Sequence, residues 1–312
     1  MLETRLQQRI ETKKQQLDAL RPLPSAAVER LNEQIRVEWI YNSNAIEGST
    51  LTLRETQLIL ETGLTIGGKS LREHFEVVNH RDAIRYVESL LEEETPFTPF
   101  HVRQIHALVL KNLDDENAGQ YRQLSVRIGG SSHQPPEAWE VPRWMSEWGE
   151  WLNGDALYEH PVVRAAIAHH RFVAIHPFID GNGRTARLVM NLILMRAGYP
   201  PTIIQRSNRA QYYKVLAQAD RGNSNPLANF VGRAVERSLT LYLQACTPRL
   251  VPVPNAERWI PLKEATEGTS YSQEYLSLLA RQGRLEAIKQ GRVWYTTRQA
   301  VADYQSALTT NR

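Results

Sequence analysis

A twelve-residue segment, residues 176–187 (HPFIDGNGRTAR), gathers the side chains of this chain that are best suited to chemistry. It holds one histidine, one aspartate, two glycines and two arginines. An imidazole titrates near neutrality and can act as a general base. Glycines let the backbone approach a ligand closely, and arginines bind phosphate oxygens through paired hydrogen bonds. The combination is typical of a site that handles a nucleotide's phosphates beside a general base.

The residues that follow must position this segment. Residues 184–197 carry apolar side chains at helical spacing and end at Gly198, which predicts a helix. The segment therefore enters a helix N-terminus, where free N–H groups and the helix dipole favour an anion. Arg184 and Arg187 are three apart, so they project from one side of the helix and can grip successive phosphates. Asp180, just upstream, is an oxygen ligand of the kind that Mg²⁺ prefers.

Each of these features alone would more often be turn chemistry or a solvated helix face. Together, nine of the twelve positions, all except Ile179, Thr185 and Ala186, match the signature of the Fic family, which the chain therefore resembles. The resemblance implies transfer of AMP from ATP to a Ser, Thr or Tyr hydroxyl of a target protein. His176 would be the catalytic base, and Asp180 would hold Mg²⁺ (or Mn²⁺). The implied ATP contacts in this segment are Asp180, Gly181, Asn182, Gly183, Arg184, Thr185, Ala186 and Arg187.

A second segment, residues 43–48 (SNAIEG), fits the pattern (Ser/Thr)-x-x-x-Glu-(Gly/Asn) of the helix that inhibits many Fic proteins. Taken alone, it could equally be a helix end closed by Gly48. In the family, the glutamate pairs with the second arginine of the catalytic motif, which corresponds to Arg187. One guanidinium cannot serve a carboxylate and a phosphate equally at once. The resemblance thus implies autoinhibition through Ser43, Glu47 and Gly48.

Residues 120–130 contain an alternating stretch that ends in Gly129-Gly130, which predicts a β-hairpin. In the resembling family, this is a flap over the active site that pairs with the target's backbone as an added strand. The alternative is a structural hairpin without a partner. The resemblance implies that Gly130, Ser131, Ser132 and His133 border the nucleotide.

Tyr212 and Tyr213 stand where family members place aromatic residues near the adenosine. Aromatic pairs on a helix are more often core residues than ligand contacts. Asp220 occupies a position where close relatives are expected to have an Asn that contacts the nucleotide.

Residues 63–70 (GLTIGGKS) satisfy the pattern of a phosphate-binding P-loop, G-x-x-x-x-G-K-[ST]. A true P-loop follows a buried strand and opens a helix within a parallel sheet. The preceding residues are instead typical of a helix, with a capping box at Thr52 and Glu55. We interpret residues 63–70 as a loop between two helices.

Helical spacing or composition extends over most of the chain and predicts an all-α core with a β-hairpin flap. We expect an N-terminal helical region at 1–95 that carries the inhibitory segment, and a catalytic core at 96–246. The predicted helices cover 1–45 with a break at 21–24, then 52–62, 70–94, 99–112, 137–153, 161–174, 184–197, 208–221 and 225–246.

The character of the chain changes after residue 246. A proline-rich linker at 247–260 leads to residues 261–312, whose pattern of helix, turn, helix and hairpin is similar to small winged helix-turn-helix domains. Five basic residues and one acidic residue between 277 and 298 give a net charge of +4. This charge fits DNA contact, to which Arg281, Arg284, Lys289 and Arg292 could contribute. The alternative is a module for protein docking or for a homodimer, since a fold does not fix a function.

Composition limits the remaining possibilities. The formal charge of +3 over 312 residues is too small to argue for nucleic acid by itself, and no apolar run reaches the length of a membrane span. The single cysteine, Cys246, fits a reducing cytoplasm, and the N-terminus lacks the features of a secretory signal. Two rival functions stay open: removal of AMP or transfer of another phosphate-containing group, and a DNA-binding regulator that uses the core as a nucleotide sensor.

Overall fold

The computed structural model describes residues 1–23, 25–92, 95–129, 131–246, 259–267, 269, 271–282, 284–290 and 293–310. The chain forms two compact units, residues 1–247 and residues 248–312. Most of the predicted linker, residues 247–258, lies outside the described residues.

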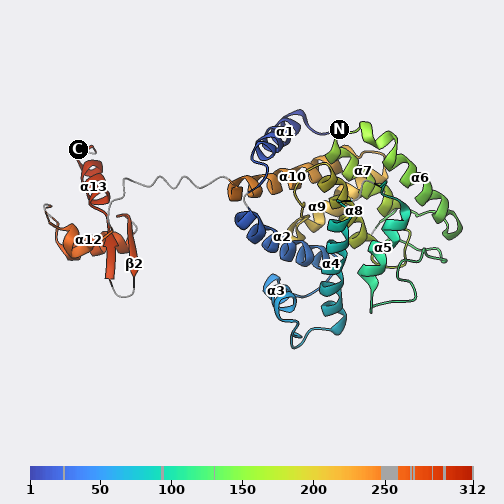
Figure 1. Ribbon diagram of the computed structural model, residues 1–312, viewed down its shortest axis with the longest axis horizontal. Helices are drawn as coiled ribbons and strands as arrows, with labels where there is room; N and C mark the ends of the chain where they lie inside the picture. The colour runs from blue at the N-terminus through green and yellow to red at the C-terminus, as the bar shows by residue number, and fades with distance from the viewer. Residues whose placement is uncertain are drawn as a thin grey trace. The chain divides into compact units, whose positions relative to one another are not determined.

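Helices build the first unit, as the sequence predicts (Figure 1). They are α1 (Thr4–Ala19), α2 (Ser25–Ile46), α3 (Leu53–Thr62), α4 (Leu71–Ser89), α5 (Pro99–Leu110), α6 (Val141–Asn153), α7 (Pro161–Ile175), α8 (Asn182–Arg196), α9 (Arg209–Asp220) and α10 (Asn225–Cys246). Short 3₁₀ turns, η1 (Ala138–Glu140), η2 (Asp155–Tyr158) and η3 (Arg206–Asn208), precede or follow some of them.

Helix α8 lies at the centre of this unit, where it packs against α7, α5, α4 and α2 (Figure 1). Nearly every side chain from Asn182 to Leu194 is buried, which is typical of a helix enclosed on all sides. The two arginines of its first turn, Arg184 and Arg187, are buried with the rest. The predicted site therefore lies inside the unit and not on an open face.

One hydrophobic core runs through the whole first unit, from Leu2 to Cys246. Helix α1 packs along α10, where Gly232 leaves room for Leu2 and Leu6: a Cβ at Gly232 would lie 2.9 Å from Leu2 Cδ2 and 3.1 Å from Leu6 Cδ2. The predicted N-terminal region and the predicted catalytic core thus pack as a single body.

Residues 63–70 form the loop between α3 and α4, so the P-loop pattern is not a P-loop. The helix that precedes it begins at the predicted capping box of Thr52 and Glu55, and a second capping box at Ser70 and Glu73 starts α4. Lys69 Nζ donates to Thr50 O at 2.8 Å, so the pattern's lysine serves this local turn.

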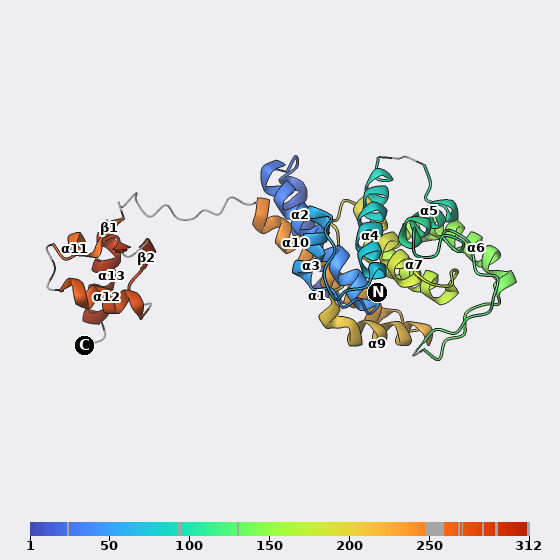
Figure 2. The same ribbon diagram turned by 90° about the horizontal axis from the view of Figure 1, so that it is seen from below.

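The expected β-hairpin is not formed as a hydrogen-bonded ladder: no strand occurs among the described residues of 120–137. The segment instead runs out, turns where Ser131 N–H donates to Ile128 O, and returns in a second extended arm (Figure 2). Arg122 and Ser125 join the arms at their base through Pro136 O and the Glu137 carboxylate. An isolated two-stranded hairpin is marginal in water, which explains why alternation alone mispredicted the ladder.

The second unit has the predicted order of helix, turn, helix and hairpin, with one extra strand and one extra helix. Its elements are β1 (Ile260–Pro261), α11 (Leu262–Ala265), α12 (Gln273–Arg281), β2 (Ala287–Gln290), β3 (Val293–Thr296) and α13 (Arg298–Thr310). The antiparallel sheet has the order β1-β3-β2, with Ile260 opposite Thr296 and Ile288 opposite Tyr295. A separate core that includes Leu276, Leu279 and Val301 holds these elements together.

Within the described part of the chain, none of the helices is both long enough and apolar enough to cross a bilayer.

Glu73 ties the turn after α2 to the start of α4. Its carboxylate accepts from the backbone N–H groups of Thr50 (2.7 Å) and Ser70 (3.1 Å) and from both hydroxyls. Burial raises the pKa of Glu73, but these bonds outweigh burial and lower the pKa to about 2. The stabilisation is therefore complete above the ordinary pKa of 4.5 and is lost as the pH falls toward 2.

We expect Glu73→Gln to lower the free energy of unfolding at pH 7 by about 1 kcal/mol, the size of a helix cap. The difference from wild type should shrink between pH 5 and pH 3, because Glu73 of the unfolded wild-type chain becomes protonated there while the folded carboxylate stays charged. Urea unfolding at pH 7, 5 and 3 measures it, with the exposed Glu61→Gln of α3 as the control. A difference that stays constant over this pH range would contradict the assignment.

Candidate functional site

His176 is held by backbone geometry at the end of α7. It is the C-cap residue, in the left-handed region at φ 49° and ψ 58°. Its Nδ1 lies 3.4 Å from Val173 O, so Nδ1 carries the hydrogen and Nε2 keeps its lone pair. Burial lowers the pKa of His176, and the charge of Arg122 lowers it further. The ring is therefore neutral near pH 7, as a general base must be.

Arg122 clamps the catalytic segment from the base of residues 120–137. Its buried guanidinium donates to three carbonyls, those of His176 (2.9 Å), Leu124 (3.0 Å) and Pro136. Its backbone N–H donates to Pro177 O at 2.9 Å. One side chain thus fixes the peptide of the predicted base and both arms of the neighbouring segment.

Asn182 closes the loop onto itself. Its side chain accepts from Phe178 N–H at 3.0 Å and donates to Phe178 O at 2.8 Å, and it is buried. Gly181, at φ 76°, then turns the chain into α8, a conformation that other residues adopt at a cost. Phe178 thus engages both polar atoms of the Asn182 side chain, and contact of Asn182 with ATP stays a prediction.

Arg187 pairs with a carboxylate and a serine at the end of α2. Its Nη1 lies 2.8 Å from Glu47 Oε1, while Nε and Nη2 donate to Ser43 Oγ (3.0 Å) and Ser43 O (2.8 Å). The Glu47 carboxylate also sits directly over Gly183, where a Cβ would overlap Oε1. The carboxylate therefore occupies the anion position that the sequence predicts for a phosphate.

Gly48 follows at φ 113° and leads the chain away from this contact. The structure thus brings the predicted residues Ser43, Glu47, Gly183 and Arg187 together at the first turn of α8.

Arg184 belongs to a mixed cluster of charges. It is buried, and its guanidinium lies 3.3 Å from both Glu76 Oε1 and Asp180 Oδ1. Arg72 Nη2 donates to Asp180 Oδ2 at 2.7 Å and Arg72 Nε donates to Glu76 at 3.3 Å. Burial raises the pKa of Asp180, but Arg184, the Gly181 N–H and Arg72 outweigh it, so the pKa lies below its ordinary value. The Asp180 carboxylate is therefore charged near pH 7.

The two middle residues of the motif are enclosed. Thr185 and Ala186 have no exposed surface, and Thr185 N–H already donates to Gly181 O at 3.0 Å. Their side chains pack inside the unit, and contact of these two residues with ATP stays a prediction.

The residues predicted near the adenosine divide into two groups. Tyr212 is buried, and its hydroxyl lies 2.9 Å from His169 Nε2, so it is a core residue. Tyr213 is partly exposed, and the centroid of its ring lies 4.9 Å from Arg209 Cζ. Asp220 accepts from His170 (2.9 Å) and from Ser131 (3.4 Å).

The predicted contacts at 130–133 adjoin this second group. His133 N–H donates to Ser131 Oγ, its Nε2 donates to Ala174 O at 2.9 Å, and Ser132 is exposed. Gly130 lies outside the described residues.

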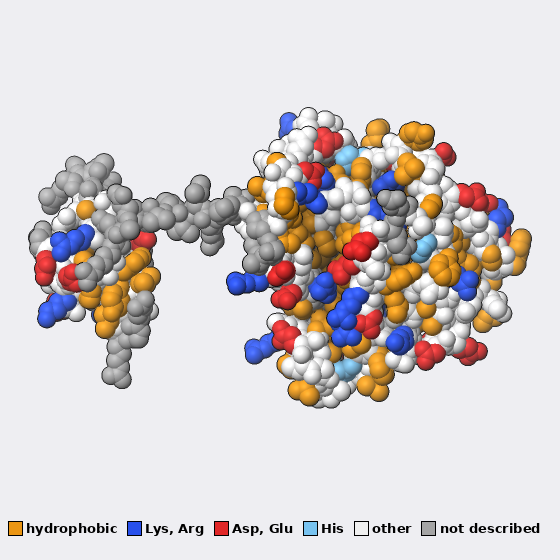
Figure 3. Space-filling view, in the orientation of Figure 1, with side chains coloured by type: hydrophobic (Ala, Val, Ile, Leu, Met, Phe, Trp, Pro, Cys, Tyr) orange, Lys and Arg blue, Asp and Glu red, His pale blue; other side chains and the backbone are white. Residues whose placement is uncertain are grey.

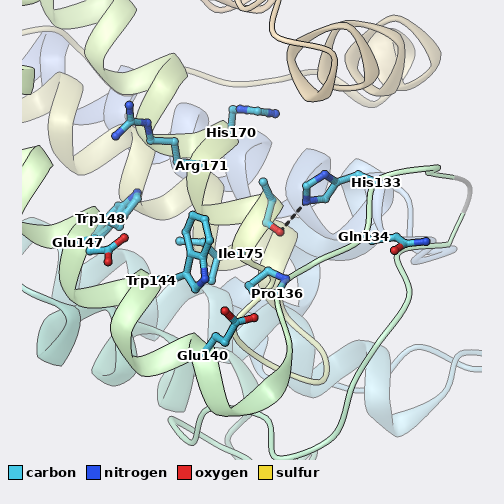
Figure 4. Close-up of a pocket in the computed structure, with 11 residues that line it drawn as sticks. His133, Gln134, Pro136, Glu140, Trp144, Glu147, Trp148, His170, Arg171 and Ile175 are labelled. Carbon is cyan, nitrogen blue, oxygen red and sulfur yellow. Dashed lines mark hydrogen bonds between the residues drawn. The ribbon is translucent and has the colours of Figure 1, made fainter.

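A cavity of about 550 Å³ opens between this segment, α6 and α7 (Figure 4). Trp144 stands beside Ile175 in it, and His133 turns toward the α7 carbonyl that it contacts. The lining residues are His133, Gln134, Pro136, Glu140, Trp144, Glu147, Trp148, His170, Arg171, Ala174 and Ile175. Of the predicted site residues only His133 lines it directly, and Asp220 reaches it through His170.

Comparison with known proteins places the chain in a family. Residues 96–194 match the family model of the Fic/DOC family. A Fic domain containing signalling protein from Bacteroides thetaiotaomicron is 31% identical, with a TM-score of 0.70 over 76% of this chain and 96% of its own. Fic-1 from C. elegans is 37% identical, with a TM-score of 0.70 over 77% of this chain and 71% of its own. The chain belongs to the Fic family.

Two further proteins are similar to this chain. A Fic family protein from Desulfovibrio desulfuricans G20 is 26% identical, with a TM-score of 0.65 over 95% of this chain and 96% of its own. The curated "Protein adenylyltransferase Fic" of Aedes aegypti is 40% identical over 252 residues, which are 80% of this chain and 50% of that protein. The chain spans about half the length of the curated relatives it matches.

Because Glu47 occupies an anion position, removing it should expose a site for inorganic anions. We expect Glu47→Gly to lower the melting temperature, since the buried Arg187 loses its counter-charge, and tripolyphosphate to raise it again. At a tripolyphosphate concentration of 100 Kd, the gain in unfolding free energy is about 2.7 kcal/mol. Thermal unfolding with and without tripolyphosphate measures both effects.

The double variant Glu47→Gly, Arg187→Met is the matched control, and it should gain much less from the anion. If tripolyphosphate stabilised wild type and Glu47→Gly equally, the carboxylate and the anion would not share a position.

Proposed function

We propose that this chain transfers AMP from ATP to a hydroxyl of a target protein. One observation carries the proposal: a neutral histidine with a free Nε2 stands at one end of a loop whose other end is a helix N-terminus with two buried arginines. Curated relatives named protein adenylyltransferase support the same reaction.

The reaction follows from these positions. His176 Nε2 takes the proton of the target hydroxyl as that oxygen attacks the α-phosphorus of ATP, and the bond to the β-phosphate oxygen breaks to release pyrophosphate. The backbone N–H groups at Asn182 and Gly183 donate to the charge that develops on the phosphate oxygens, and the Gly181 N–H, which donates to Asp180 Oδ1 at 2.6 Å, would have to turn from that carboxylate to join them. Arg184 and Arg187 hold the β- and γ-phosphates.

Asp180 fits a divalent cation of the Mg²⁺ or Mn²⁺ type. Its charged carboxylate is 47% exposed, and one carboxylate together with substrate phosphates is a usual way to bind Mg²⁺. Among the described residues, no group of three or more His, Cys, Asp or Glu could hold a metal ion by itself. An ion held by Asp180 would supply charge neutralisation to the phosphates, and Arg72, which contacts Asp180 Oδ2, would share or yield this oxygen.

We further propose that Glu47 inhibits this reaction. Its carboxylate holds Arg187 and covers Gly183, so a γ-phosphate and this carboxylate compete for one place. Removal of AMP, or transfer of another phosphate-containing group, would use the same residues, and a panel of donors with intact-mass measurement distinguishes these reactions.

A reducing, cytoplasmic setting suits the single cysteine, Cys246.

The exposed side chains of the second unit suit two kinds of partner. Arg281, Arg284 and Lys289 are exposed, which suits DNA phosphates, while Arg292 lies outside the described residues. Basic side chains appear on the visible face of this unit in Figure 3. Leu278, Ile288 and Val293 are also exposed, which suits protein docking or a homodimer instead.

The central test is incubation of wild-type and Glu47→Gly protein with α-labelled ATP and lysate. We expect labelling by Glu47→Gly to exceed that by wild type about 10-fold or more, the gain expected if only about a tenth of wild-type molecules are competent. His176→Ala in the same background should abolish labelling while the Kd for ATP stays within a few-fold.

Absence of any labelled protein with Glu47→Gly would reject the regulatory proposal. Lost ATP binding in His176→Ala would assign this histidine to the nucleotide pocket and not to proton transfer.

The DNA proposal is tested by gel shifts at several salt concentrations with Arg281→Ala, Arg284→Ala protein. Losing two phosphate contacts should weaken binding and reduce the slope of log K against log salt by about 2. The control removes the same charge from exposed positions of the first unit, Arg5→Ala and Arg85→Ala. Indifference to the first pair would favour docking.

A further inference from the structure

His106 is a buried histidine of α5 whose two ring nitrogens contact two different loops. Nδ1 accepts from Gly119 N–H at 2.9 Å, and Nε2 lies 2.9 Å from Asp180 O. Since an N–H can only donate and a carbonyl can only accept, the ring must be neutral with its hydrogen on Nε2. Protonation of Nδ1 would break the bond to Gly119.

The face of the same ring supports the catalytic loop. It stacks on Phe178 at 3.6 Å between centroids, with an interplanar angle of 2°. A Cβ at Gly181 would lie 3.2 Å from His106 Nε2, so the loop passes as close to the ring edge as a glycine permits. The His106 ring therefore contacts the loop at two places, Phe178 and Asp180. The side chain of Asn182 bonds to Phe178 and ties the first place to the start of α8.

We propose that His106 is a positioning residue that fixes the phosphate-binding loop relative to the segment expected to receive the target. Gly119 immediately precedes residues 120–137, and Asp180 and Gly181 immediately precede α8. A shift at either bond moves the acceptor hydroxyl relative to the α-phosphorus, and misplacement by about 1 Å can reduce a rate about 100-fold. His106 itself touches neither substrate, so its effect is exerted through the two loops. The inference rests on the proposed AMP transfer.

Burial lowers the pKa of His106 to about 4, which agrees with a ring that stays neutral in the folded protein. Arg184, whose charge also disfavours a second cation there, adds to this shift.

Amide side chains separate the two bonds. His106→Gln places a donor near the position of Nε2 and can keep the bond to Asp180 O, whereas His106→Asn places an acceptor near Nδ1 and can keep the bond to Gly119 N–H. His106→Phe keeps the stack on Phe178 and removes both bonds. All three are made in the Glu47→Gly background, and labelling, the Kd for ATP and the melting temperature are measured for each.

We expect His106→Phe, which loses both bonds, to lower kcat for labelling about 100-fold, while the Kd for ATP changes by less than about 3-fold. His106→Gln and His106→Asn, which each keep one of the two bonds, should each lower kcat by about 10-fold. Losses that follow only the melting temperature, with Gln no better than Phe, would show a merely structural role and overturn the proposal. An Asn variant as active as the parent would also overturn it.

A spectroscopic measurement gives a readout that does not depend on activity. In a long-range ¹H–¹⁵N spectrum of the full chain near pH 8, His106 should show a protonated Nε2 and an unprotonated Nδ1. A hydrogen on Nδ1 would reject the inference. An inactive Glu47→Gly parent with the expected tautomer would instead reject the proposed AMP transfer, so the two failures are distinguishable.

Discussion

The charge of Arg187 in the middle of the first unit is the constraint that the rest of the site satisfies. Burial lowers the pKa of this guanidinium, but the Glu47 carboxylate and the Tyr212 hydroxyl outweigh burial and raise it. The Arg187 side chain is only 3% exposed, so its charge must be compensated by partners inside the protein. Ser43, near the end of α2, and Glu47, just after α2, are these partners. The same need makes the position attractive to any other anion, so inhibition and phosphate binding arise from one physical cause.

The neighbours of the two buried arginines are kept neutral for the same reason. Burial and Arg187 lower the pKa of His169 to about 3, and burial with both arginines holds the pKa of His80 well below its ordinary value. Histidines at these positions add polarity without adding a cation. The two arginines at the first turn of α8 are therefore the cations that pair with the carboxylates of Glu47, Glu76 and Asp180, or with phosphates that replace them.

The sequence predicts the motifs of this arrangement and misses supports that have no motif. The loop at 176–187 and the helix that follows could be found from the spacing of their residues, whereas the Glu47–Arg187 pair was implied by the resemblance of two motifs to the Fic family. The supports from Arg122 and His106 could not, because they lie 54 and 74 residues away from the groups that they hold. A single arginine or histidine that belongs to no motif gives no sequence pattern from which its distant partner could be predicted.

The sequence cannot decide where a residue's chemistry allows two partners. Asn182 can donate to a phosphate or close its own loop, and the three-dimensional arrangement adds that its side chain bonds twice to Phe178. Alternation at 120–128 predicted a ladder, whereas side chains from Arg122 and Ser125 join the arms without one. In both cases local polar bonds compete with the interaction that the pattern suggests.

The position of Glu47 one residue beyond α2 bears on how it could leave Arg187. The turn is fixed from two sides, because Arg209 Nε donates to Ile46 O at 2.7 Å and Glu73 accepts from Thr50 N–H at 2.7 Å. The Glu47 side chain is nevertheless 35% exposed, whereas Ser43 is buried. Rotation of one side chain therefore costs fewer contacts than displacement of the helix end. On the proposed mechanism, a phosphate has to displace only the Glu47 carboxylate from Arg187, while the backbone around Glu47 stays in place.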